Sequence, residues 1–404
     1  MKVMVAFEHR FLRTREGTIH TRSTFDHGFL SRYLQVFDEV VVLARVEDVD
    51  SARSDMPRAD GPGVSFHPLP CYLGPWQYLL NLPALRRGIA AAAGSADAFV
   101  LRVSGAVGTL LWRRLVGRGL PYGVEVVADP WDALSPGSVR SVLRPLARQI
   151  QTRDLARQCR DAIAAAYVTA EGLQRRYPPG GWTTHYSSVE LPGERIREAS
   201  VLDIRAARVA DVRAGNRRWC IGYVGTLWQL YKAPDSVIEA FASCVDRGLD
   251  ADLVMVGDGQ YREQLEQLAS RLGVAERVEF AGAVERGAAV DAQLDRLDLM
   301  VLPSRQEGLP RIVIEAMARA VPCIASTVGG IPELLPAEDM VAPADAGALA
   351  AKISEVLRDD ARLAAMSRRN LDGAQVYRAD ELEKRRIEFY RRVAEAVGSP
   401  RPPR

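Results

Sequence analysis

The sequence has little lysine, little cysteine and almost no net charge. Only four of its 53 basic residues are lysines, and the formal net charge is +2, so a chain-wide basic surface for nucleic acid is absent. The five cysteines are scattered, odd in number and form no Cys-x-x-Cys pair. This disfavours a zinc site or a disulfide framework and fits a reducing cytosol. No apolar run approaches the ~20 residues of a membrane span, and the charges at 8–10 come too early for a signal peptide.

Strand-like and helix-like segments alternate along the whole chain of 404 residues, 48% of them apolar. Runs such as 39–44 and 253–256 lack polar alternation and therefore suit strands buried on both faces. The expected strands are Met1–Phe7, Glu39–Ala44, Asp97–Val103, Tyr122–Ala128, Ala162–Thr169, Trp219–Val224, Asp252–Val256, Arg277–Ala281, Asp298–Leu302 and Val321–Ala325. The expected helices cover residues 26–37, 76–93, 105–118, 138–160, 234–247, 260–272, 286–295, 311–319, 346–358 and 378–397.

This alternation predicts an α/β fold with two doubly wound, parallel-sheet, Rossmann-like domains. Ligands bind at the carboxyl ends of such strands, so we expect the two domains to face each other across a cleft. The expected divisions are an amino-terminal domain at 1–200, a linker at 201–217, a carboxyl-terminal domain at 218–376, a terminal helix at 377–398 that packs back toward the first domain, and a disordered tail at 399–404.

Residues 298–335 carry the most chemical information. A buried strand ends in Pro303-Ser304, a short polar loop follows, and Pro310 stands where a helix begins, which is the position that proline favours. Unpaired amides at a helix start bind anions and hydroxyls. Glu307 precedes this helix and Glu315 lies about one turn inside it, with its side chain leaning back toward the helix start. Two such carboxylates can hold two sets of vicinal hydroxyls, and the alternative is one capping and one solvated glutamate.

The spacing Glu307-x7-Glu315, with the flanking Pro-Ser and the later Gly-Gly-x-Pro-Glu at 329–333, resembles glycosyltransferase family 4. Its members are retaining glycosyltransferases of the GT-B fold, a pair of Rossmann-like domains. The resemblance implies that Glu307 contacts the donor sugar and Glu315 the ribose of the nucleotide. It also implies that Gly308, Leu309 and Pro310 line the sugar site.

Three further segments resemble parts of the donor site in that family. Residues 221–241 are similar to its phosphate loop, which places Gly225 and Lys232 at the diphosphate, although Thr226 stands where the family has an arginine. A lysine in this lysine-poor chain is a favourable match, and a solvated loop lysine is the alternative. Gly257, Asp258 and Gly259 resemble the turn near the nucleotide, a turn that is also common as a structural feature. Val284 ends a segment that commonly meets the base.

The amino-terminal part matches the family less well. The family has a Gly-Gly loop after the first strand and a histidine after a middle strand. Here residues 8–25 read as a long loop, and strand 97–103 has no histidine. The acceptor-side candidates are His20, Arg102 and Asp129, each with a purely structural role as the alternative.

An arginine-rich helix is expected at 138–160. Its basic residues are Arg140, Arg144, Arg148, Arg153, Arg157 and Arg160, against the single acid Asp154. The first three share one helix face. Such a face can meet anionic lipid or a diphosphate-linked acceptor, and in this arginine-rich chain simple solvation is the alternative. We therefore expect a cytoplasmic protein with peripheral contact at the inner membrane face as one interpretation.

The resemblance implies a retaining glycosyltransferase that moves a sugar from a nucleoside-diphosphate sugar to an acceptor hydroxyl in polysaccharide, glycolipid or natural-product glycoside biosynthesis. Lys232 and the helix amides would stabilise the leaving diphosphate, so no metal and no resident cofactor are expected. The alternatives are a GT-B sugar-nucleotide epimerase, a glycogen- or sucrose-type synthase, and a sugar-nucleotide-binding protein without turnover. The base, which in the family is UDP, GDP or another, and the identities of sugar and acceptor are not encoded in these motifs.

Overall fold

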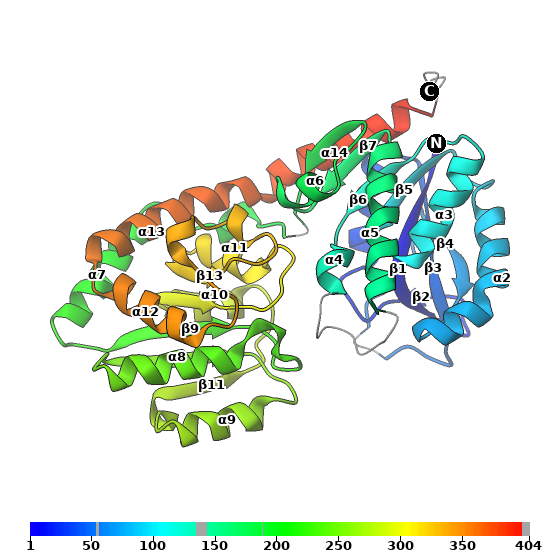
Figure 1. Ribbon diagram of the computed structural model, residues 1–404. Helices are drawn as coiled ribbons and strands as arrows, with labels where there is room; N and C mark the ends of the chain where they lie inside the picture. The colour runs from blue at the N-terminus through cyan, green and yellow to red at the C-terminus, as the bar shows by residue number, and fades with distance from the viewer. Residues whose placement is uncertain (54–55, 135–143, 188, 398–404) are drawn as a thin grey trace. The chain divides into compact units, whose positions relative to one another are not determined.

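The computed structural model describes residues 1–53, 56–134, 144–187 and 189–397. The chain divides into two compact units (Figure 1). Unit 1 combines Met1–Ser188 with the end of the chain from Glu383, and unit 2 is Val189–Leu382. The predicted pair of doubly wound α/β domains is confirmed.

Unit 1 contains one sheet with the strand order β4-β3-β1-β5-β6-β7-β8, in which every neighbouring pair is parallel. The short β2 pairs antiparallel with the end of β1. The strands are β1 (Lys2–Arg13), β2 (Ile19–His20), β3 (Glu39–Asp48), β4 (Val64–Pro70), β5 (Ala98–Val103), β6 (Gly123–Val126), β7 (Ala164–Tyr167) and β8 (Trp182–His185). The strand order reverses between β1 and β5.

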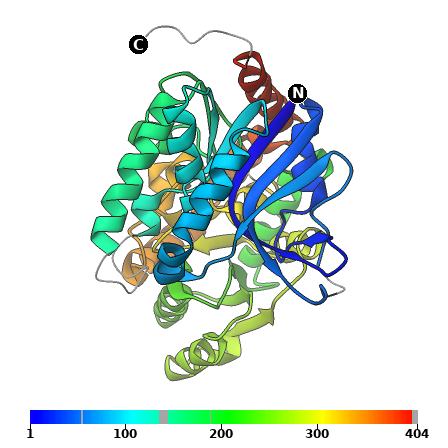
Figure 2. The same cartoon turned by 90° about the vertical axis from the view of Figure 1, so that its right-hand side faces the viewer.

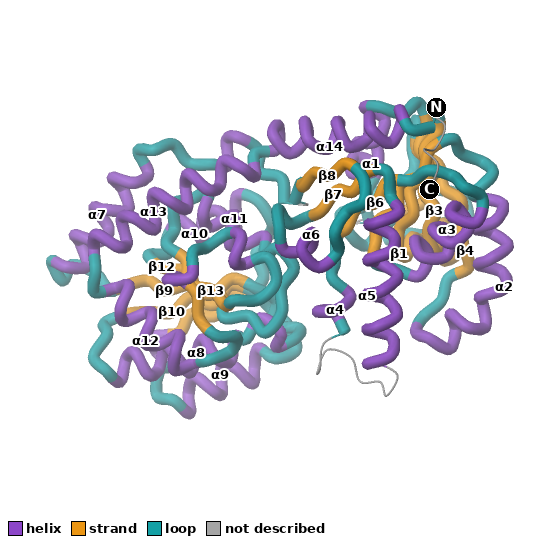
Figure 3. The backbone as a smooth tube through the Cα atoms, turned by 45° about the horizontal axis from the view of Figure 1, so that its top comes forward, coloured by secondary structure: helices purple, strands orange, loops and turns teal. Residues whose placement is uncertain are grey.

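Helices cover both faces of this sheet. Figures 2 and 3 show α2, α3 and α5 side by side on one face, and ion pairing of Arg113 with Asp154 joins the last two. On the other face, Tyr33 of η1 stacks against Tyr390 of α14 with ring centroids 4.6 Å apart. The helices of unit 1 are α1 (His27–Leu30), η1 (Ser31–Gln35), α2 (Gly74–Ala92), α3 (Ala106–Gly117), α4 (Pro130–Ala133), α5 (Arg144–Asp161), α6 (Gly172–Arg176) and α14 (Ala379–Glu395) from residue 383 onward.

Unit 2 has a second parallel sheet with the order β11-β10-β9-β12-β13-β14, which reverses between β9 and β12. Its strands are β9 (Trp219–Val224), β10 (Ala251–Val256), β11 (Val278–Gly282), β12 (Leu299–Leu302), β13 (Cys323–Ser326) and β14 (Met340–Val341). Its helices are η2 (Gly193–Arg195), α7 (Val201–Arg213), η3 (Leu230–Lys232), α8 (Pro234–Asp246), α9 (Arg262–Arg271), η4 (Ala275–Arg277), α10 (Ala288–Asp295), α11 (Arg311–Met317), η5 (Ile331–Glu333), η6 (Ala337–Asp339), α12 (Ala346–Leu357), α13 (Asp360–Ala374) and η7 (Gln375–Tyr377).

Every expected strand corresponds to an observed one, because these apolar runs form the buried centres of the two sheets. The sequence interpretation missed β4, β8, α7 and α13, whose burial patterns are mixed, and the short elements β2, β14, α4 and α6. Among the described residues, no helix combines the length and apolar content needed to cross a bilayer.

The predicted linker at 201–217 is wrong, because residues 201–213 form α7 and unit 2 already begins at residue 189. This segment is rich in alanine and arginine, both good helix formers. Arg205 of α7 is buried and donates hydrogen bonds to the carbonyl oxygens of Leu297 and Arg319, so α7 is anchored to the core of unit 2.

The predicted loop at 8–25 is also wrong, since β1 continues to Arg13 after an irregularity in its pairing between Ala6 and Arg10. The polar residues Glu8, His9 and Arg10 concealed this continuation. The predicted tail at 399–404 and the first part of helix 138–160 lie outside the described residues, and α5 begins at Arg144.

Candidate functional site

The strand order of unit 2 reverses between β9 and β12, and the loops that follow these two strands carry the strongest candidates. In open α/β sheets, ligands bind outside the carboxyl ends of the strands at such a reversal. Lys232 ends the loop after β9, and Glu307 lies in the loop after β12. The topology therefore brings together two residues that are 75 positions apart in the chain.

Lys232 and Glu307 form an ion pair with 2.7 Å between Nζ and Oε1. Their side chains are 14% and 8% exposed. The Ser304 hydroxyl donates to the same Oε1 at 2.8 Å, and Ser326 in turn donates to the carbonyl oxygen of Ser304 at 2.7 Å. Within the described parts of the chain, Glu307 Oε2 receives no hydrogen bond, so this oxygen is available to a ligand hydroxyl.

Arg305 holds the two loops together. Its amide donates to the Tyr231 carbonyl at 2.7 Å, and its guanidinium donates to the Leu230 carbonyl at 2.6 Å. The same guanidinium makes a bidentate pair with Asp235 at 2.9 and 2.7 Å, and this hydrogen bonding raises the pKa of Arg305. The position of Lys232 is thus fixed from the opposite loop.

Glycines set the close approach of these loops to their neighbours. Gly257 has φ +140°, and a Cβ there would lie 1.8 Å from the carbonyl oxygen of Gly225. A Cβ on Gly259 would lie 2.1 Å from the amide nitrogen of Trp228. These two glycines were predicted to admit a ligand, but the backbone that approaches them is that of the chain's own loop after β9. This packing agrees with the structural alternative, and the role of both glycines toward a ligand stays a prediction.

The remaining members of the predicted donor site have ordinary loop contacts. Thr226 Oγ1 accepts a hydrogen bond from the Trp228 amide at 3.2 Å, and Asp258 Oδ1 accepts one from the Gly259 amide at 2.7 Å. Val284 is half-buried and packs against the core of unit 2. Their roles toward a ligand stay predictions.

The loop that contains Glu307 also rests on the segment after β13. Gly329 has φ +57°, and a Cβ there would lie 2.2 Å from the Glu307 carbonyl oxygen. The Gly330 amide donates to the Gly308 carbonyl at 2.6 Å. The Gly-Gly-x-Pro-Glu segment therefore supports the backbone on the carboxyl side of the glutamate. Gly308 is exposed and Leu309 is half-buried.

The helix after this loop is shorter than expected. Helix α11 spans seven residues, Arg311–Met317, and Pro310 is its N-cap residue in an extended conformation instead of its first helical residue. The Val313 amide donates to the Pro310 carbonyl at 3.2 Å, so the first turn is partly satisfied internally. A two-turn helix of this kind contributes less to anion binding than the predicted nine-residue helix.

Glu315 is buried within α11 and paired with two arginines. Its Oε1 lies 3.1 Å from Nε of Arg311 and 3.4 Å from Nη2 of Arg195. Arg195 also makes a bidentate pair with Asp291, which raises the pKa of Arg195. Both arginines were missed in the sequence. The i,i+4 spacing of Arg311 and Glu315 was a usable signal, whereas Arg195 lies 120 positions away and gave none.

The acceptor-side candidates of unit 1 all have internal partners. His20 bonds through its ring to the Thr18 hydroxyl at 3.1 Å and the Met56 carbonyl at 3.2 Å. Asp129 is the N-cap of α4, where it accepts hydrogen bonds from the Trp131 amide and the Tyr177 hydroxyl.

Arg102 belongs to the core of unit 1. It is buried and pairs with Glu125 at 2.7 Å, and Glu125 also accepts hydrogen bonds from the hydroxyls of Tyr33 and Tyr186. Burial disfavours the charged carboxylate, but Arg102 and these hydroxyls outweigh it and hold the pKa of Glu125 below its ordinary value. Arg102 is thus held in a buried network, and its role toward an acceptor stays a prediction.

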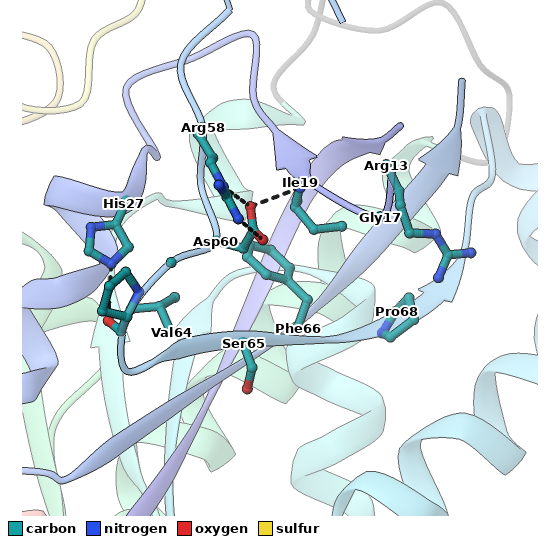
Figure 4. A pocket seen from close by; sticks show the side chains of 12 residues that line it. Arg13, Gly17, Ile19, His27, Arg58, Asp60, Val64, Ser65, Phe66 and Pro68 are labelled. Atoms are coloured by element: carbon teal, nitrogen blue, oxygen red, sulfur yellow. Dashed lines mark hydrogen bonds and ion pairs between the residues drawn. The ribbon is translucent and has the colours of Figure 1, made fainter. Parts of the chain in front are cut away.

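Unit 1 also contains a pocket of about 680 Å³ beside β2, which the sequence gave no reason to expect (Figure 4). Figure 4 shows Phe66 of β4 and Ile19 near the bidentate pair of Arg58 and Asp60. Another lining residue, Arg13, is paired with Asp48. The charged members that line this pocket are thus neutralised by protein partners.

Comparison with known proteins gives a family and several relatives. A family model described as glycosyl transferases group 1 matches residues 218–359. The chain is 27% identical over 322 residues to Protein CapJ of Staphylococcus aureus. The alignment covers 80% of this chain and 78% of that protein. It is 29% identical over 222 residues to a GDP-mannose-dependent alpha-(1-6)-phosphatidylinositol monomannoside mannosyltransferase of Mycolicibacterium smegmatis, covering 52% and 54% of the two chains.

Among solved structures, HepE of Anabaena in complex with UDP-glucose has a TM-score of 0.60 to this chain at 17% identity. The match covers 99% of this chain and 100% of that one. At this identity the likeness establishes the fold. The family model matches the same part of the chain, 218–359, that carries most of the motifs noted in the sequence.

Proposed function

We propose that this chain is a glycosyltransferase of the retaining type that uses a nucleoside-diphosphate sugar as donor, because residues 218–359 match the model of the glycosyl transferases group 1 family and the chain has the GT-B fold. The sugar would pass to an acceptor hydroxyl. The observation that carries the proposal is the ion pair between Lys232 and Glu307 at the strand-order reversal of unit 2.

Lys232 is suited to the departing diphosphate. Its side chain is 14% exposed, and its ammonium group is oriented before any ligand arrives by Glu307 and, through the loop backbone, by Arg305. Negative charge builds on the diphosphate as the glycosidic bond breaks, and an oriented cation stabilises that charge without reorganisation. No metal is required for this role, and no resident cofactor is proposed.

Glu307 is suited to the sugar. Its Oε1 is held by Lys232 and Ser304, which leaves Oε2 to accept hydrogen bonds from sugar hydroxyls. The acceptor hydroxyl would attack on the face that the diphosphate leaves, through a state with oxocarbenium character. Glu315 is proposed for the ribose, with Arg195 and Arg311 fixing its carboxylate. We assign no covalent nucleophile, because a carboxylate at the anomeric carbon is not identified.

The base and the acceptor are open. One relative is named as dependent on GDP-mannose, and one structural neighbour is described with UDP-glucose. Acceptors in polysaccharide, glycolipid or natural-product glycoside biosynthesis all fit a hydroxyl nucleophile. A GT-B epimerase or a binding protein without turnover remains the second candidate, because Thr226 replaces the expected arginine and strand β5 carries no histidine.

The proposal is tested first by a thermal-shift panel of nucleoside diphosphates, since the correct base stabilises the protein by mass action. With that donor, Glu307→Gln is expected to lower sugar transfer by about 10²-fold or more, because it removes a carboxylate from the reacting sugar. Nucleotide binding should stay within about tenfold. The exposed Glu276→Gln is the matched control. A normal rate for Glu307→Gln, or release of an epimerised donor without any acceptor, would refute the proposal.

A further inference from the structure

Two helices of unit 1 carry large apolar side chains in solvent. Trp76 and Leu80 in the first two turns of α2 are 79% and 81% exposed, and Leu73 and Leu79 beside them are also exposed. On α5, Leu146 and Ile150 are exposed in the same way. Single exposed apolar residues are ordinary on a protein surface, but a group of this kind on two helices of the same sheet face marks an interaction surface.

These residues share one edge of the unit 1 sheet. Helices that connect parallel strands run opposite to them, so the helix starts lie at the carboxyl edge of the strands. Helix α2 follows β4 and α5 precedes β7, which places the apolar first turns of both at that edge. Helix α3 lies between them, packed against α2 and ion-paired to α5 (Figures 2 and 3).

Each of the two helices has an exposed stripe of side chains that changes from apolar to basic along the helix. On α2, positions 73, 76, 80, 83 and 87 follow helical spacing, and the stripe passes from leucine and tryptophan to Arg87. On α5, positions 146, 150, 153 and 157 do the same, ending in Arg153 and Arg157. Leu80 and Arg87 are seven residues apart, which is roughly 10 Å along a helix axis.

The exposed charges along these two stripes are arginines that are free for a partner. Helix α2 contains no acidic residue among its 19, and α5 has five arginines against two aspartates. Within the described segments, Arg87, Arg153 and Arg157 form no ion pair. An apolar edge with arginines about 10 Å behind it matches the side of an anionic bilayer, where hydrocarbon lies below a layer of phosphate groups.

We propose that the carboxyl edge of unit 1 docks on an anionic lipid bilayer, with Trp76, Leu79 and Leu80 inserted at the interface and Arg87, Arg153 and Arg157 at the phosphate groups. The tryptophan suits this depth, because its ring is apolar and its N–H is polar. This inference concerns binding alone and does not depend on the reaction proposed above.

Flotation with vesicles tests the surface without donor or acceptor. The wild-type chain should float with vesicles of phosphatidylcholine and phosphatidylglycerol, and at least tenfold less with phosphatidylcholine alone. Trp76→Glu combined with Leu80→Glu should lower the bound fraction on anionic vesicles by at least tenfold. Both residues are exposed, so the fold should hold, as circular dichroism and nucleotide-induced thermal shift would verify.

Ile204→Glu on α7 of unit 2 is the matched control, because Ile204 is 60% exposed and lies outside the surface. Arg87→Glu with Arg153→Glu should remove the preference for anionic over neutral vesicles. Wild-type protein that stays unbound, a Trp76/Leu80 variant that binds normally, or equal binding to neutral vesicles would overturn the proposal. So would light scattering that shows a dimer which the Trp76/Leu80 variant dissociates, because a second copy would then cover the surface.

Discussion

Each unit contains an ion pair of the same length near the reversal of strand order, but the two pairs lie in different surroundings. Arg102–Glu125 in unit 1 and Lys232–Glu307 in unit 2 both measure 2.7 Å and both lie near the reversal of strand order in their sheet. The first joins two adjacent strands inside the sheet, at the register position where Arg102 opposes Glu125. The second joins two loops beyond the strand ends.

The surroundings of the two pairs differ more than their geometry. Glu125 is saturated by tyrosine hydroxyls, and Arg102 lies over the rings of Phe7, Phe25 and Phe29. Glu307 keeps one oxygen without a described protein partner. An ion pair whose members are fully satisfied stabilises or specifies a fold, whereas one with unused capacity can exchange its partner for a ligand. The comparison therefore separates a pair whose members are fully bonded within the protein from a pair that we propose binds a ligand.

The largest effect is expected for Glu125→Leu, which disrupts the buried pair of unit 1. It leaves the Arg102 guanidinium buried without its partner, and removal of one member of a buried ion pair costs about 3–5 kcal/mol of stability. Chemical denaturation should show this loss in the free energy of unfolding. Nucleotide binding by the folded fraction should be unchanged. The double variant Arg102→Leu with Glu125→Leu should recover part of the stability, and failure to do so would mean that the tyrosine hydroxyls carry the cost.

The corresponding change in unit 2 is Lys232→Met. It should lower sugar transfer by about 10²-fold, or about 2.7 kcal/mol in activation free energy, because one preorganised cation is lost at the leaving diphosphate. Its effect on the free energy of unfolding should be much smaller than that of Glu125→Leu. Lys352→Met on α12 is the matched control, since Lys352 pairs with Glu355 on its own helix. A variant that loses stability but retains its turnover per folded molecule would make this pair structural too.

A smaller effect is expected from His9 of unit 1, on the pH dependence of stability. Burial and the nearby Arg45 and Arg10 lower the pKa of His9 to about 4, against an ordinary value near 6.5. The unfolded chain therefore binds more protons than the folded one between these values, so His9 opposes folding increasingly as the pH falls from about 6.5 to 4. His9→Gln should flatten the decline of melting temperature across this window. An unchanged pH profile would place the acid sensitivity elsewhere.

Much of the fold was predictable because the strands of both sheets are continuous apolar runs. Strand β9 was predicted with its observed bounds, and β10, β12 and β13 within a few residues. Strand β1 was cut short at Phe7 because its continuation through Glu8 and His9 is polar. Helix α7 was missed because arginines and aspartates interrupt its apolar residues, and few of its side chains are buried. Arg205 anchors it by bonding to distant carbonyl groups.

The candidate site divides in the same way. Motif spacing identified Lys232 and Glu307 separately, and their contact needed the folded sheet. Arg305 and Arg195 were invisible in the sequence because an arginine at the surface and an arginine bonded to a partner across the fold look the same. Gly257 and Gly259 were predicted correctly as turn glycines, but the close neighbour is a backbone loop of this chain.

The amino-acid sequence by itself determined the alternation of strands and helices, the two parallel sheets and the identity of the acidic and basic residues at the strand ends, because local apolar pattern and residue type are written position by position. Tertiary structure decided which charges meet. Lys232 reaches Glu307 while Arg102 is enclosed with Glu125, since only the ordering of strands in the sheets fixes the neighbours of residues that are far apart in the chain.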